Sequence, residues 1–158
     1  MGADIHVLLE RKVDGRWETW DRFAGIPKRA LVRDVQDAGY DLHYRFTYRN
    51  YAFFAALAGV RGDGPDPRGL PYDISPVAKA YVDNWGDDGH SHTYLFADEF
   101  CEAFMAHHMT EEEIAEFTEA QLKSSLFRGW EYIMNFYICN TEDNEPASNY
   151  RFIIFFDN

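Results

Sequence analysis

Residues 150–156 read YRFIIFF, a stretch that is apolar on both of the faces it would present as a β-strand. Such a strand belongs in the centre of a sheet, where both faces are covered. Residues 3–11 read ADIHVLLER and alternate with period two, which predicts a second strand with Ile5, Val7 and Leu9 on one face. We expect these two strands, from opposite ends of the chain, to pair in one sheet.

Turn and capping signals outline the elements between these strands. Asp14-Gly15 predicts a hairpin into a strand at 16–20, and 90–95 reads as a further strand. The predicted helices span 50–58 with Asn50 as N-cap, 75–85 with Ser75 as cap, 97–107, and one long or two shorter segments over 110–137. Residues 21–48 show no strong period. We therefore predict one α+β domain over 1–158, a small mixed or antiparallel sheet covered by four to five helices.

Composition limits the classes of protein to consider. Aromatic residues make up 17% of the 158-residue chain, which excludes general disorder. Rings beyond the needs of a core are expected to line a pocket or an interface, so a homo-oligomer is one possibility. Cys101 and Cys139 have no metal-binding spacing and predict two buried, reduced thiols. With no apolar run long enough for a bilayer and no signal pattern, we expect no membrane contact and a cytoplasmic protein.

Charge is unevenly distributed along the chain. The formal net charge is −12, and residues 51–158 carry 6 Lys/Arg against 19 Asp/Glu. A field of this sign repels a phosphate backbone, which argues against general nucleic-acid binding. A small anion held by a local arginine cluster remains compatible with it.

Asp4, His6, His90 and His92 form the first candidate constellation. Alternation on strands would place Asp4 beside His6, and His90 beside His92 and Tyr94. If the two segments were neighbours, the four side chains could bind zinc, manganese or iron, or a neutral imidazole could act as general acid or base. Alternatively the histidines contact a ligand without metal, or are structural. Ser91 lies between the histidines, but adjacent strand residues face opposite ways, which predicts no Ser–His pair.

Arginines in and beside two Gly- and Pro-rich loops form the second constellation. Arg49, Arg61 and Arg68 offer rigid forks for phosphate or carboxylate, and Arg49 and Asn50 precede a predicted helix start that favours anions. Tyr51 could stack on a base, as could Tyr72 and Trp85. The alternative is that these arginines pair with the aspartates of the same loops, at positions 63, 66, 73, 87 and 88.

Several motifs together resemble a family of small proteins from tailed phages and prophages. They are Gly-Ala-Asp-Ile-His at 2–6, Arg-Asn-Tyr at 49–51, Leu-Ala-Gly-Val-Arg at 57–61, Arg-Gly-Leu-Pro at 68–71, His-Ser-His-Thr-Tyr-Leu at 90–95 and Phe-Asp-Asn at 156–158. Residues 20–48 and 107–148 carry no part of the resemblance. It implies a phage setting, in an infected or lysogenic bacterial cell, and no particular activity.

Three functional hypotheses follow. The first is a protein that binds a small anionic ligand, foremost a nucleotide, and in a phage could sequester a host defence signalling nucleotide. Its pocket would include Asp4, His6, Arg49, Asn50, Tyr51, Arg61, Arg68, His90 and His92. The second is a metal-dependent hydrolase or lyase acting on a nucleotide or phosphoester. The third is an acidic interaction protein that occupies a basic host partner.

Overall fold

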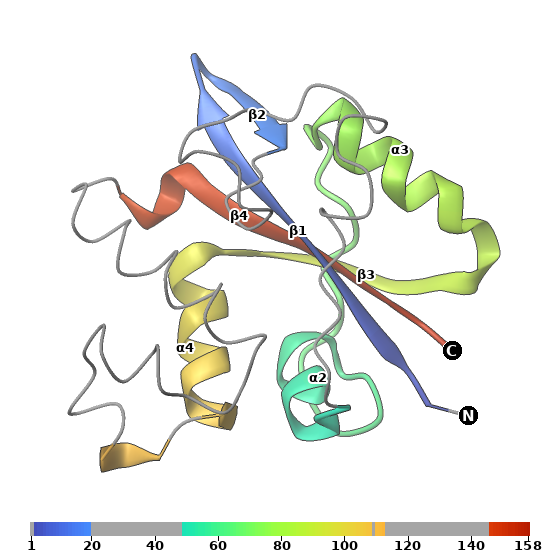
Figure 1. The fold of residues 1–158 in the computed structure, drawn as a ribbon, viewed down its shortest axis with the longest axis vertical. Helices are drawn as coiled ribbons and strands as arrows, with labels where there is room; N and C mark the ends of the chain where they lie inside the picture. Colours follow the sequence, from blue (N-terminus) through green and yellow to red (C-terminus); the bar gives the residue numbers. More distant parts are fainter. Residues whose placement is uncertain (1, 20–48, 109, 113–145) are drawn as a thin grey trace, which may run out of the picture.

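A computed structural model describes residues 2–19, 49–108, 110–112 and 146–158, which are built around a four-stranded antiparallel sheet (Figure 1). The strands are β1 (Asp4–Val13), β2 (Arg16–Thr19), β3 (Gly89–Phe96) and β4 (Tyr150–Asp157). Their order across the sheet is β2-β1-β4-β3. The predicted pairing of the N-terminal and C-terminal strands is therefore confirmed, and together they form the centre of the sheet.

The pairing registers follow from local sequence signals. Asp14 and Gly15 both have positive φ, 50° and 79°, as a tight hairpin turn requires, and they connect β1 to β2. β1 and β4 then pair along nearly their whole length, from Asp4 opposite Asp157 to Arg11 opposite Tyr150. Residues near the two chain ends thus lie side by side at one end of the sheet (Figure 1).

Three α-helices are found in the described residues: α2 (Tyr51–Ala58), α3 (Pro76–Trp85) and α4 (Ala97–His108). Two 3₁₀ turns, η2 (Gly86–Asp88) and η3 (Ala147–Asn149), precede β3 and β4. The predicted caps are confirmed: the Asn50 side chain accepts from the Phe53 N–H at 3.1 Å, and the Ser75 hydroxyl from the Ala78 N–H at 3.4 Å. The helix predicted after Thr110 lies almost wholly outside the described residues, as do residues 21–48.

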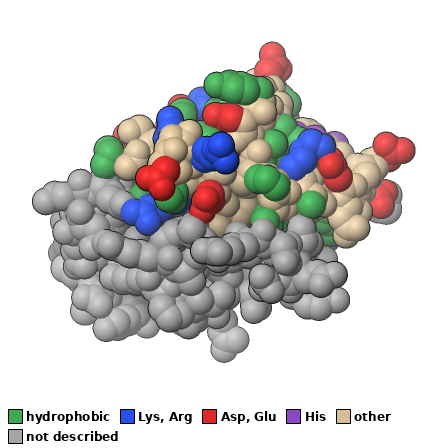
Figure 2. Space-filling model, turned by 90° about the horizontal axis from the view of Figure 1, so that it is seen from above, with side chains coloured by type: hydrophobic (Ala, Val, Ile, Leu, Met, Phe, Trp, Pro, Cys, Tyr) green, Lys and Arg blue, Asp and Glu red, His purple; other side chains and the backbone are tan. Residues whose placement is uncertain are grey.

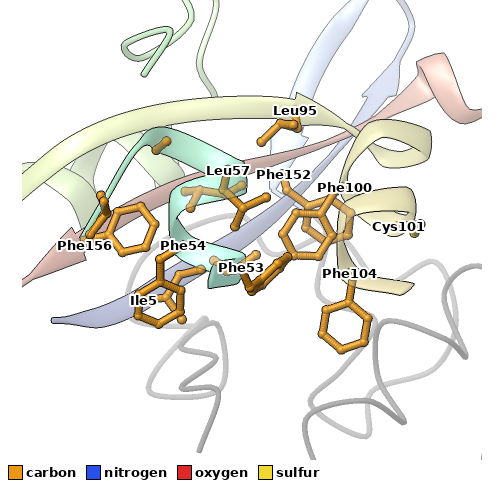
Figure 3. Packing of buried hydrophobic residues seen from close by; sticks show 14 of the residues in the cluster. Ile5, Phe53, Phe54, Leu57, Leu95, Phe100, Cys101, Phe104, Phe152 and Phe156 are labelled. Carbon is orange, nitrogen blue, oxygen red and sulfur yellow. The ribbon is translucent and has the colours of Figure 1, made fainter. Parts of the chain in front are cut away.

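The sheet is covered on both faces, which explains why the middle of β4, Phe152 to Phe156, is apolar on both faces. On one face α2 and α4 enclose an aromatic cluster that includes Phe53, Phe100 and Phe152 (Figure 3). On the other face α3 packs over Leu8, Ile153 and Phe155. Every residue of β4 is consequently buried, as a two-sided apolar strand predicts.

Cys101 lies in the first of these clusters, and burial raises the pKa of its thiol to about 12. It is a buried, unoxidised thiol, as predicted, while Cys139 lies outside the described residues. In the described part of the chain, no helix combines the length and apolar character that crossing a membrane requires.

Candidate functional site

Most of the candidate side chains lie at the end of the sheet where β1 begins and β4 finishes. We call this the terminal end, and define it by Asp4, His6, Arg49, Tyr51, Arg61, His90, Ser91, His92 and Asp157. Asp4 and Gly89 each pair with Asp157 in the strand registers, so three strands meet here. α2 packs on the same region, since the Phe54 ring lies 5.1 Å from the Phe156 ring.

Arg49 is held in place by Asp4. Its Nε and Nη2 donate to the two carboxylate oxygens of Asp4 at 3.0 and 3.4 Å, and this contact raises the pKa of Arg49. The guanidinium also lies against the backbone of Gly2, where an added Cβ would collide with it. The Arg49 side chain nevertheless remains 53% exposed. It is a positioned cation that faces solvent.

Tyr51 has one cation over its ring. Arg61 places its guanidinium carbon 5.9 Å from the centre of the Tyr51 ring. Arg61 is exposed and has a left-handed backbone φ of 62°, which sets its direction after α2 ends at Gly59. Asn50, by contrast, is used within the fold, because its amide caps α2 and donates to the His107 carbonyl at 3.1 Å.

Arg68 belongs to the scaffold. Its guanidinium donates to both oxygens of Glu99, at 2.9 and 2.7 Å, and to the Tyr94 carbonyl at 3.1 Å. The bond from Arg68 lowers the pKa of Glu99. This network fastens the loop after α2 to β3 and α4. Arg49 and Arg68 therefore bind the carboxylates of Asp4 and Glu99, so the alternative in which these two arginines pair with the loop aspartates does not hold.

His6 is fully buried and bound to Asp157. Its Nε2 lies 2.7 Å from Oδ2 of that residue, across 151 positions of sequence. The ring also stacks on Phe155 and contacts Trp85, with centroid distances of 4.7 and 4.3 Å. A ring enclosed in this way has no surface for a substrate to reach, so these contacts support a structural role for His6 in joining β1 to β4.

His90 and His92 lie on opposite faces of the sheet, so the prediction that they share a face is wrong. His90 pairs with Phe156 and Thr93 with Ile154, so that one extra residue of β3 is accommodated in a β-bulge. As a result His90 stacks on Phe156, at 6.3 Å, and His92 on Phe155, at 5.6 Å. Strict alternation fails because Ser91 has a φ of 52°.

The bulge also brings the side chains of His90 and Ser91 into contact, which regular strand alternation would not allow. Nδ1 of His90 lies 3.0 Å from Oγ of Ser91, so the prediction of no Ser–His pair is wrong. Nε2 of His90 is buried and has no hydrogen-bond partner among the described residues. Burial, followed by the neighbouring His90, lowers the pKa of His92.

The metal candidates are not assembled in the described part of the chain. No three His, Cys, Asp or Glu side chains there are placed to share one ion. Asp4 binds Arg49, His6 binds Asp157, and the two β3 histidines are divided between the faces. Zinc, manganese or iron binding stays a prediction without support from these contacts.

A second polar cluster, at the opposite end of the same strands, was missed by the sequence reasoning. We call it the Arg151 cluster; it comprises Glu10, Trp17, Thr19, Asp73, Ser75 and Arg151. Arg151 donates to Glu10 at 2.6 Å and to Asp73 at 2.8 Å, and stacks 4.1 Å over Trp17. Glu10 also accepts from the Ser75 N–H at 2.6 Å, and Ser75 hydrogen-bonds Thr19 at 2.7 Å. The sequence did carry one signal for this cluster, since Glu10 and Arg151 are charged residues inside two strands that were predicted to pair.

The visible surface does not form one patch of a single charge. On the described part of the face in Figure 2, Lys and Arg side chains are interspersed with Asp and Glu. This mixture offers no broad basic surface for nucleic acid.

Comparisons with protein-family models, with curated proteins and with solved structures found no match.

Proposed function

We propose that the protein binds a small anionic ligand at the terminal end, with a nucleotide as the leading candidate. The observation that carries this proposal is that Arg61 lies over the Tyr51 ring, while the exposed guanidinium of Arg49, two residues earlier in the chain, is oriented by Asp4. In a chain of net charge −12, these two guanidinium groups and the nearby aromatic ring offer a local site for an anion attached to a planar group.

The arginine geometry suits phosphate. Asp4 takes Nε and Nη2 of Arg49, and Nη1 has no hydrogen-bond partner among the described residues. A guanidinium already oriented by a carboxylate loses less side-chain freedom when a phosphate binds, which improves affinity. Arg61 adds a second fork, and the Tyr51 ring offers a face on which a base can stack.

The resemblance to tailed-phage proteins supplies a setting for this activity. In an infected cell, a small protein that binds a nucleotide without consuming it would lower the free concentration of that nucleotide. We propose sequestration of a host signalling nucleotide as the biological role. The buried state of His6 supports binding in preference to chemistry at the Asp4–His6 pair.

Isothermal titration calorimetry against mononucleotides, cyclic mononucleotides, cyclic dinucleotides and inorganic phosphate tests the proposal. We expect one class to bind, and Arg49→Ala and Arg61→Ala each to weaken it by about 10- to 100-fold, since a charge-assisted hydrogen bond is lost. Lys79→Ala is the matched control, because it removes one exposed positive charge from α3, which covers the Phe155 face. Equal affinity in all three variants, or no binding by any class, would overturn the proposal.

A further inference from the structure

The bulge in β3 holds a serine in a backbone conformation that serine seldom adopts. The φ of Ser91 is 52°, in the left-handed region where a Cβ costs energy, and the residue is neither Gly, Asn nor Asp. Strained residues of this kind persist where the surrounding structure fixes them, and β-bulges often re-aim side chains beside active sites. Here the bulge turns Ser91 towards the preceding histidine.

The Ser91–His90 contact is as short as that between a catalytic nucleophile and its general base. Oγ of Ser91 lies 3.0 Å from Nδ1 of His90, within the range that proton transfer requires. Stacking on Phe156 at an interplanar angle of 28° fixes the plane of the His90 ring. Because Nε2 has no hydrogen-bond partner among the described residues, the Ser91 contact is the one that orients the imidazole there.

The His90–Ser91 pair is more exposed to solvent than the His6–Asp157 pair of the terminal end. His6 is fully buried, whereas both His90 and Ser91 are only partly buried. Ser91 thus keeps part of its surface exposed to solvent in the folded protein. The Cys101 thiol, by contrast, is fully buried, and burial raises its pKa, which keeps it protonated.

We propose that Ser91 is a nucleophile and His90 its general base, and that together they react with acyl or phosphoryl esters that carry a good leaving group. With Nδ1 unprotonated, His90 accepts the hydroxyl proton while Oγ forms a bond to the carbonyl carbon or phosphorus. The leaving group departs with the electrons of the bond that breaks. This activity goes beyond ligand binding and does not depend on Arg49 or Arg61, so either proposal can fail without the other.

A fluorophosphonate probe tests the dyad on the intact chain. Attack by Oγ forms an O–P bond and breaks the P–F bond; fluoride leaves, and the proton passes through Nδ1 of His90 to solvent. Intact mass spectrometry then shows one added phosphonyl group, and peptide mapping locates it. We expect modification at Ser91, and a labelling rate about 100-fold lower in His90→Gln, the loss typical of removing a general base.

Ser91→Gly is the matched control, since glycine adopts a positive φ without strain and so preserves the bulge while removing the hydroxyl. Its circular dichroism should match the wild type while the adduct disappears. If folded wild-type protein gives no adduct at Ser91, or is labelled only at other serines, the proposal is wrong. An adduct that forms at the same rate in His90→Gln would also overturn it, because Ser91 would then react as an ordinary exposed hydroxyl.

Discussion

The two ends of the β1–β4 pair both bring opposite charges together, but they leave them in different surroundings. In the Arg151 cluster the guanidinium is bound by Glu10, by Asp73 and by the Trp17 ring, and the Arg151 and Glu10 side chains are 3% and 0% exposed. At the terminal end Arg49 has one carboxylate partner, Asp4, and is 53% exposed. The same pairing of groups thus joins the strands where it is buried, and leaves donors facing solvent where it is exposed, which is why we propose the terminal end as the ligand site.

The largest effect is expected from Arg151→Met. This change leaves the Glu10 carboxylate buried without its cation, which costs about 3–5 kcal/mol of the free energy of unfolding. Urea denaturation followed by circular dichroism measures the loss. The double variant Glu10→Gln/Arg151→Met removes both charges and should recover part of it. If Arg151→Met lowers the free energy of unfolding by only about 1 kcal/mol or less, as expected for an exposed ion pair, the Arg151 cluster does not act as a buried structural ion pair.

Arg68→Ala is expected to have an intermediate effect. The Arg68–Glu99 pair is partly exposed, so screening by solvent limits the loss to about 1 kcal/mol at pH 7, even with the bond to the Tyr94 carbonyl. Because the pKa of Glu99 is lowered in the folded state, the pair stabilises above the unfolded pKa of the carboxyl and is lost as pH falls below it. Denaturation at pH 7 and pH 3 should show a smaller cost of the substitution in acid, and an equal cost would refute the pairing.

The lowered pKa of His92 predicts a further pH dependence of the free energy of unfolding. Its pKa is lowered in the folded protein, so the unfolded chain binds more protons between the folded value and the ordinary value of 6.5. Stability should therefore fall as pH decreases through this window, by at most about 1.4 kcal/mol per pH unit. Comparing denaturation at pH 7.5 and 5.5 in wild type and His92→Gln checks this. The variant should lose less stability on acidification, and an identical loss would contradict the assignment.

The smallest effects on stability are expected at the exposed arginines. Arg49→Ala and Arg61→Ala should each leave the free energy of unfolding nearly unchanged, as surface substitutions usually do. They should still weaken ligand binding, whereas Arg151→Met is expected to lower stability. Thermal denaturation of the two variants beside Arg151→Met provides the comparison. A loss of stability at either arginine comparable to that of Arg151→Met would place it among the structural residues.

Much of the fold was predictable because its signals are local. The two-sided apolar pattern of residues 150–156, the Asp14-Gly15 turn and the Asn50 and Ser75 caps each act within a few residues, and all appear as expected. The α+β class and the antiparallel pairing of the terminal strands follow from them. The predicted number of helices stays without support, because the helical segments predicted after Thr110 lie largely outside the described residues.

The site was less predictable because its partners are distant or depend on one backbone angle. Asp157 binds His6 from the other end of the chain, and Glu99 of α4 binds Arg68 in the loop after α2, so no spacing rule indicates either contact. The separation of His90 from His92 results from the positive φ of Ser91, which a side-chain pattern cannot reveal. Arg49 and Tyr51, adjacent to a predicted helix start, were the part of the site that local reasoning could locate.

We propose that the terminal end, and not the Arg151 cluster, binds an anion. A ¹⁵N–¹H correlation spectrum recorded during titration with the tightest-binding nucleotide of the calorimetric panel tests this most directly. We predict saturable shifts at residues 2–6, 49–61 and 89–92, with residues 73–75 and 150–152 unchanged. Shifts centred on 73–75 and 150–152, or no saturable shift anywhere, would contradict the account.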